Sequence, residues 1–220
     1  MPTAIEGAYG TVSVHAMTEL DAVNMMLSNA GESPVDTLEN STNADAVQSR
    51  QVLLDASRDV QLEGWHFNTE HGVTLAVEKP TPGKIPVPVN ALRVDISPHT
   101  GKIADYLRHD IIQRGAYLYD LTEHTDKFDH DITVTITYLL AFEQLPDAAR
   151  YYITVKAARR FRQMIDGGDD GMGSLSQQDE LRARNTLMRE DSRGLDAGFL
   201  SPRNNTLIGH DLGRVLRRRL

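Results

Sequence analysis

The sequence predicts an α+β protein, in which a four-helix body carries an inserted β-rich domain and ends in an extended C-terminal arm. Apolar residues recur at helical spacing in residues 18–64 and again in residues 143–194. Between these segments, "DITVTITY" alternates apolar residues with threonine, which is typical of a strand. We therefore divide the chain into an N-terminal segment (1–17), the helical body (18–64 and 143–194), the β-rich domain (65–142) and the arm (195–220).

Residues 18–64 are predicted to form two helices. Thr18 is a good N-cap for "ELDAVNMMLSNAG", and Gly31 supplies the left-handed stop. After the turn "ESPVDTLENSTN", Asn43 can cap a longer helix that ends near Gly64. Because the connection between them is short and contains proline, we expect the two helices to pack as an antiparallel pair.

The apolar period changes at Trp65, where the β-rich domain is expected to begin. "WHFN" and "GVTL" are predicted as short strands, and "GAYLYD" and "DITVTITY" as the strongest ones. The four prolines of "EKPTPGKIPVPVNALRVDIS" exclude a helix and favour an extended or edge path. Trp65, the single tryptophan, could anchor a partner, but at a helix-to-strand junction it is expected in the core.

A third helix is predicted after Pro146, which fits the first helical turn. Asp147 complements the positive end of that helix, and Ile153, Ala157 and Phe161 form an apolar stripe. The stretch "GGDDGMG" is expected to stop it.

A fourth, heavily charged helix is predicted next. "SLSQ" offers a capping box at Ser174 and Gln177, and the helix is expected to run to about Arg193. After Gly194 few periodic apolar residues remain, so residues 195–220 are predicted to form the arm.

The composition excludes several classes of function. There are 31 acidic against 23 basic residues and a net charge of −8, which disfavours a protein that grips nucleic-acid phosphates over its whole surface. The absence of cysteine excludes disulfides, thiolate metal sites and a cysteine nucleophile. No apolar run is long enough to predict a membrane segment. Phosphate-loop, G-x-S-x-G and H-E-x-x-H patterns are also missing, so we predict neither a cofactor nor a metal.

The densest polar cluster is "DLTEHTDKFDHD", residues 120–131. Its acidic side chains and histidines could bind a hard cation or supply the two carboxylates of a glycoside hydrolase. Such clusters between two strands are more often solvated turns, and the alternating acids and central glycine of a calcium loop are missing. The hydrolase alternative would take its acids from Glu123, Asp126, Asp129 or Asp131.

The predicted third helix mixes basic and aromatic residues, which raises the question of what it contacts. Its basic side chains could face nucleic acid, or could simply be solvated. A protein interface explains the tyrosines better, because tyrosine and arginine are enriched at interface hot spots. We predict interface roles for Tyr151, Tyr152, Arg159 and Arg160 on this helix, and for Arg214, Arg217, Arg218 and Arg219 on the arm.

Four segments, in this order along the chain, carry a resemblance to a known family: "TELDAVNMMLSNAGESPVDTLENSTNADAVQSRQVLL", "EGWHFNTEHGVTL", "GAYLYDLTEHTDKFD" and "QLPDAARYYITVKAARRF". Together they resemble the tail tubular protein A family of T7-like podoviruses, over most of residues 18–161. The resemblance implies a virion protein of the short non-contractile tail, made in the host cytoplasm. It implies a helical body with an inserted β domain and a twelve-subunit ring between the portal and the nozzle protein, tail tubular protein B, near the tail fibres. It carries over no active-site residue.

The sequence therefore predicts a noncatalytic tail adaptor, a head-to-tail connector through which DNA passes during packaging retention and ejection without sequence-specific binding. The first alternative is a tail-associated carbohydrate hydrolase that acts on the host envelope. The second is a DNA-binding module that uses the basic arm, whose affinity would fall steeply with salt and vanish on truncation at Gly213.

Overall fold

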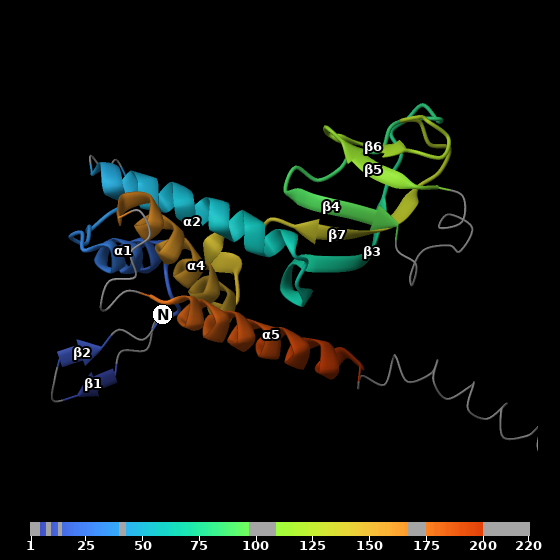
Figure 1. The fold of residues 1–220 in the computed structure, drawn as a ribbon. Helices are drawn as coiled ribbons and strands as arrows, with labels where there is room; N and C mark the ends of the chain where they lie inside the picture. Colours follow the sequence, from blue (N-terminus) through green and yellow to red (C-terminus); the bar gives the residue numbers. More distant parts are fainter. Residues whose placement is uncertain are drawn as a thin grey trace, which may run out of the picture.

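The computed structural model describes residues 5–7, 10–12, 15–39, 43–96, 109–166 and 175–199. Its helices are α1 (Glu19–Ala30), α2 (Ala44–Leu62), α4 (Asp147–Asp166) and α5 (Gln177–Phe199), with single 3₁₀ turns at His66–Asn68 and Phe142–Gln144. Its strands are β1 (Ile5–Gly7), β2 (Gly10–Val12), β3 (Thr69–Leu75), β4 (Ala91–Ile96), β5 (Ile111–Arg114), β6 (Tyr117–Asp120) and β7 (Ile132–Tyr138). The predicted α+β class, with four helices, is confirmed (Figure 1).

The two helix starts predicted for residues 18–64 are confirmed. The Thr18 hydroxyl accepts a hydrogen bond from Asp21 N at 3.1 Å, and Asp21 Oδ2 accepts one from Thr18 N at 2.9 Å, which completes a capping box. These bonds also hold the pKa of Asp21 below its ordinary value. Gly31 ends α1 with φ of 82°, a conformation that glycine adopts without strain. Asn43 caps α2 through Asp45 N and Ala46 N.

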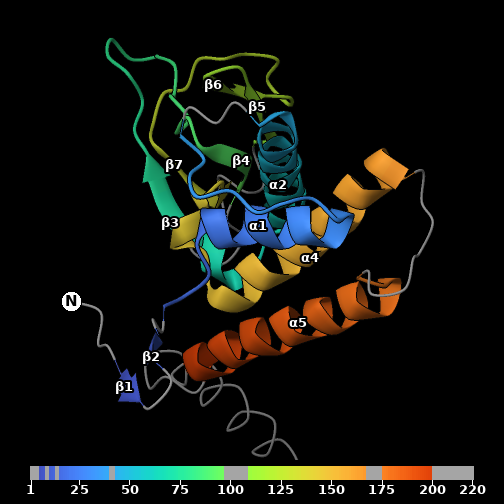
Figure 2. The same cartoon turned by 90° about the vertical axis from the view of Figure 1, so that its left-hand side faces the viewer.

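The packing of the first two helices differs from the prediction. Figure 2 shows α1 running across the view while α2 is seen nearly end-on behind it, so the two cross instead of lying antiparallel. The reason is α4, which contacts α1, α2 and α5 and is the central helix of the body. A short loop predicts that two helices meet, but a third helix that packs on both decides the angle.

The fourth helix, α5, begins and ends at other residues than the sequence predicted. Its cap is Ser176, whose hydroxyl accepts from Asp179 N at 3.3 Å while Asp179 Oδ2 accepts from Ser176 N at 3.0 Å. The predicted box at Ser174 therefore begins two residues too early, although the motif class is right. At the other end, α5 continues through Gly194 to Phe199, because glycine inside a helix weakens it without ending it.

The described strands pair in three small antiparallel sheets. The order β3-β7-β4 forms the largest one, in which β7 is central, while β5 pairs with β6 and β1 with β2. Along β7, Ile132, Val134 and Ile136 are fully buried and alternate with the threonines, as predicted. The "WHFN" strand prediction is wrong for residues 66–68, which form a 3₁₀ turn. The expected edge path is confirmed by β4, an edge strand of this sheet.

The buried apolar residues form two clusters. One lies among the four helices and includes Trp65, as predicted, together with Phe161 and Leu53. The other lies in the β-rich part, around Ile132 and Leu118. The predicted domain boundaries stay a prediction. Within the described residues, no helix has the length and apolar character needed to cross a membrane.

Candidate functional site

The acidic cluster of residues 120–131 occupies the turns between β6 and β7. Asp120 is buried, and its carboxylate lies against His109 Nδ1 and accepts hydrogen bonds from Thr122 N at 2.8 Å and Glu123 N at 3.3 Å. Burial opposes the charge of Asp120, but these bonds outweigh it and lower the pKa of the carboxyl below its ordinary value. The side chain therefore acts as an anchor for the turn.

Three further acids of the cluster, Asp126, Asp129 and Asp131, also have structural partners. Asp126 Oδ2 lies 2.7 Å from Lys84 Nζ, and this hydrogen-bonded pair lowers the pKa of Asp126. Asp129 contacts His130 Nδ1, and that contact lowers the pKa of Asp129. Asp131 Oδ1 accepts from Val77 N at 2.9 Å, which ties the turn to the end of β3.

These contacts do not favour the hydrolase alternative. A glycosidase needs one carboxyl with a raised pKa to protonate the leaving oxygen. Three carboxyls of the cluster instead have lowered pKa values: Asp120, Asp126 and Asp129. Among the described residues, no group of three or more acidic or histidine side chains is placed to hold a metal ion. We read the cluster as a folded turn.

A hollow of about 340 Å³ lies beside the cluster and is lined by His109, Glu123, Lys127 and Phe128 among others. His109 Nε2 is buried there without a hydrogen-bond partner. The hollow brings both signs of charge together with the ring of Phe128. Within the described residues, no serine or threonine hydroxyl forms a hydrogen bond with the His109 imidazole. The described geometry contains no nucleophile and base pair.

Helix α4 contains the first group of predicted interface residues. Tyr152 is only 3% exposed, because α4 is covered by other helices on several sides. Arg159 pairs with Glu180 of α5, and Arg160 Nη1 lies 2.7 Å from Asp59 Oδ2 of α2. Tyr151, 41% exposed, is the member of this group that stands open to a partner.

Arg150 shows most clearly what the basic residues of α4 contact. Its guanidinium donates to three backbone carbonyls, those of Leu145 at 2.8 Å, Met17 at 2.7 Å and Glu143. Arg162 Nη1 likewise donates to Asn29 O at 2.6 Å. The basic helix therefore holds its own subunit together. Arg214, Arg217, Arg218 and Arg219 lie outside the described residues, and the interface role of both groups stays a prediction.

Two exposed helix faces were missed by sequence reasoning. On α5, Leu181 and Met188 are 53% and 49% exposed, and on α2, Val47 and Leu54 are 55% and 46% exposed. In each pair the residues are seven apart, so they lie on one face of the helix. The spacing is visible in the sequence, but only the structure shows that the opposite face of each helix already fills the core.

Comparison with known proteins shows the family to which the chain belongs. A family model described as "Tail tubular protein" matches residues 20–196 of the chain. The chain is also similar to "Tail tubular protein A" of Klebsiella phage KP34, with 31% identity over 178 residues, which cover 80% of this chain and 88% of that protein. The match extends past the four segments that first suggested the family and includes most of α5.

Proposed function

The chain belongs to the tail tubular protein family, and from that membership we propose that it is the adaptor of a short phage tail. As a member of this family the protein is a structural component of the virion tail. In the proposed role it forms a ring of twelve subunits between the portal at the capsid vertex and the nozzle protein. Tail fibres attach near this junction, and no chemical step is part of the role.

The observation that supports the proposal is the combination of family membership with a helical body that leaves two faces open. A closed ring is built from head-to-tail contacts, so each subunit must present two different complementary surfaces. Helices α2 and α5 each bury one face and expose apolar residues on the other. In the acidic cluster, by contrast, Asp120, Asp126 and Asp131 are bound by groups of the same chain.

The passage of DNA fits the charge of the chain. With a net charge of −8 per subunit, a ring accumulates negative potential, and acidic walls repel the phosphate backbone so that DNA slides without being held. Arg159 and Arg160 of α4 do not offset this negative potential, since both are paired with carboxylates of the same chain. The proposal therefore includes DNA passage without sequence-specific binding.

The test is the composition of phage particles produced without this protein. We expect heads that keep the portal but lack the nozzle protein, and a plasmid copy of the gene should restore the nozzle. Particles that retain the nozzle in normal amounts would overturn the adaptor role, because the nozzle would then have another attachment.

A further inference from the structure

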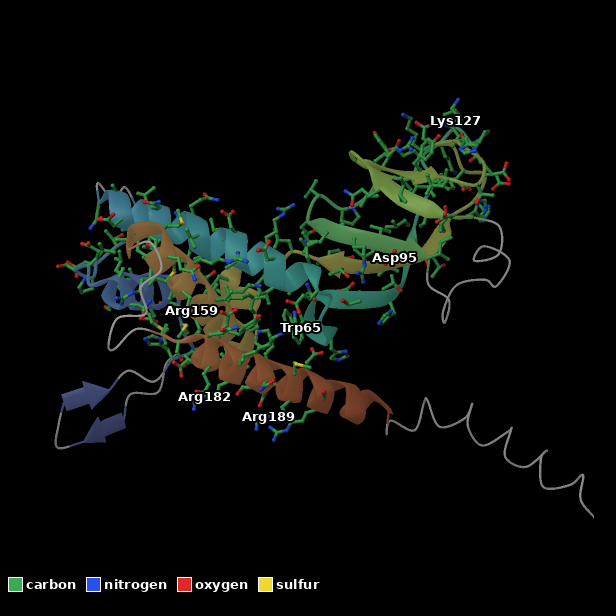
Figure 3. All side chains as sticks on the ribbon, viewed as in Figure 1. Trp65, Asp95, Lys127, Arg159, Arg182 and Arg189 are labelled. Atoms are coloured by element: carbon green, nitrogen blue, oxygen red, sulfur yellow. The ribbon has the colours of Figure 1, made fainter. Side chains whose placement is uncertain are left out.

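The outer face of α5 combines an apolar edge with a basic edge. At 100° per residue, Leu181 and Met188 fall on one side of this face, and Arg182, Arg189 and Arg193 fall on the other. The three arginines and Met188 line one shallow hollow along the helix. Figure 3 shows Arg182 and Arg189 on the side of α5 that points away from the body. We call these five residues the α5 outer face.

The carboxylates of α5 do not neutralise this face fully. Glu180 pairs with Arg159 inside the body, and Asp191 Oδ1 accepts from His66 N at 2.8 Å. Arg182 and Arg193 share exposed ion pairs with acids three residues earlier, which are weak in water. Among the described residues, Arg189 has no ion pair and donates only to Thr186 Oγ1 and Asn185 O. A partner carboxylate can therefore bind Arg189 without breaking an existing ion pair.

Helix α2 presents the complementary arrangement. Val47 and Leu54 form an apolar edge, and Asp55 and Asp59 fall on the other edge of the same exposed face. We call these four residues the α2 outer face. Arg58 also lies on this exposed face, between the two edges. Asp59 pairs with Arg160 of α4, so Asp55 is the carboxylate of this face that has no ion pair among the described residues.

These two faces lie on opposite sides of the helical body. Figures 1 and 2 both show α4 between α2 and α5, and α4 contacts each of them. The unpartnered face of α2 thus points away from the unpartnered face of α5. Two such surfaces cannot meet within one subunit, but they can meet between neighbours in a ring.

We propose that the α5 outer face of one copy packs on the α2 outer face of the next copy, head to tail around the ring. Leu181 and Met188 then pack against Val47 and Leu54, since both pairs repeat every seven residues. Arg189 pairs with Asp55, which has no ion pair among the described residues, and this pairing fixes the orientation of the contact. The inference rests on the proposed ring and names its subunit interface.

The absence of cysteine from the chain permits a clean cross-linking test. A variant with both Leu54→Cys and Met188→Cys is assembled with the portal and treated with a flexible thiol-reactive cross-linker that tolerates a shift of about one helical turn, roughly 5.4 Å. We expect a covalent ladder that extends beyond the dimer. Each single-cysteine variant can link only in pairs, so it should stop at the dimer.

A second double-cysteine variant is the control for the cross-linking test. Val89→Cys with Met188→Cys places the first cysteine at a fully exposed position of the β-rich part. We expect no ladder from it. A ladder that is no stronger in the Leu54 and Met188 variant than in this control would overturn the proposed interface.

A charge reversal tests the same contact independently. Arg189→Glu should raise the concentration needed for assembly by about tenfold or more, because a cross-interface ion pair becomes a repulsion. The matched control is Lys127→Glu, the same charge change at the far end of the molecule in Figure 3, which should assemble as the wild type does. Equal thermal midpoints for both variants would show that folding is not the cause. Unchanged assembly of Arg189→Glu would contradict the interface.

Failure of the interface and failure of the ring give different results. If the wild type forms rings and both tests match their controls, the ring stands but its contacts lie elsewhere. If the wild type stays monomeric even with portal, the proposed function fails and the interface fails with it.

Discussion

Gln61 joins the helical body to the β-rich part, and its replacement is the most direct test of how the two parts are held. The side chain is fully buried near the end of α2. Its Oε1 accepts from Leu140 N at 2.7 Å, and its Nε2 donates to Leu140 O at 3.1 Å and to Ser57 Oγ at 3.0 Å. Residue 140 lies two residues after the end of β7, so these bonds tie the central strand to the helix.

Gln61→Leu keeps the approximate size of the side chain but leaves both backbone groups of Leu140 without their partner. An unsatisfied buried polar group costs about 1–3 kcal/mol, and Leu140 is half-buried, so water recovers part of this cost. We therefore expect a loss of about 2–4 kcal/mol in the free energy of unfolding. The loss follows from these two bonds and from the bond to the buried Ser57 hydroxyl, because the apolar replacement leaves no polar atom of its own to satisfy.

The assay is urea unfolding followed by the fluorescence of Trp65, the single tryptophan, which is buried beside this joint. Gln48→Leu, at an exposed position of the same helix, is the matched control and should change stability by about 0.5 kcal/mol or less. A loss below about 1 kcal/mol for Gln61→Leu, with an unchanged urea slope, would refute the reasoning.

Three further predictions concern other anchors of the fold. Arg150→Met should cost about 2–4 kcal/mol in urea unfolding, because three backbone carbonyls lose a charged donor; an effect within error would contradict that role. Thr18→Ala should cost about 1 kcal/mol through loss of the α1 cap, whereas Thr18→Ser should be nearly neutral, and equal losses would argue against capping. Asp120→Asn should destabilise the protein at pH 7. Because the folded-state pKa of Asp120 is lowered from 3.8, its contribution is present above about pH 4 and is lost as the pH falls through that lower value. The difference from wild type in thermal midpoint should shrink over that range, and a constant difference would contradict the ionised pair.

The sequence predicted the parts of the fold that local chemistry decides. Thr18 and Asn43 mark helix starts because each cap is made with residues two or three positions away. The alternation in β7 is visible because a strand that is central to its sheet follows a strict period. The crossing of α1 over α2 was not predictable in this way, since it depends on α4, more than a hundred residues further along the chain.

The contacts of the predicted interface residues on α4 could not be predicted for the same reason: they depend on helices that are distant in the sequence. Helix α4 has three helical neighbours, so its buried face is wide enough to include Tyr152, while Arg150 and Arg160 reach partners from other elements. Periodicity shows which face of a helix is apolar, but not how many neighbours cover it. Family membership, by contrast, was predicted from ordered segments, and the comparisons confirm it.

The central claim, that the chain assembles into a ring on the portal, is tested most directly by the mass of the purified protein. Light scattering on a sizing column gives this mass for the protein alone and after mixing with its portal. The account predicts a ring, in either sample, of twelve copies of the 24.5 kDa chain. A mass of 24.5 kDa that does not change when portal is added would contradict it.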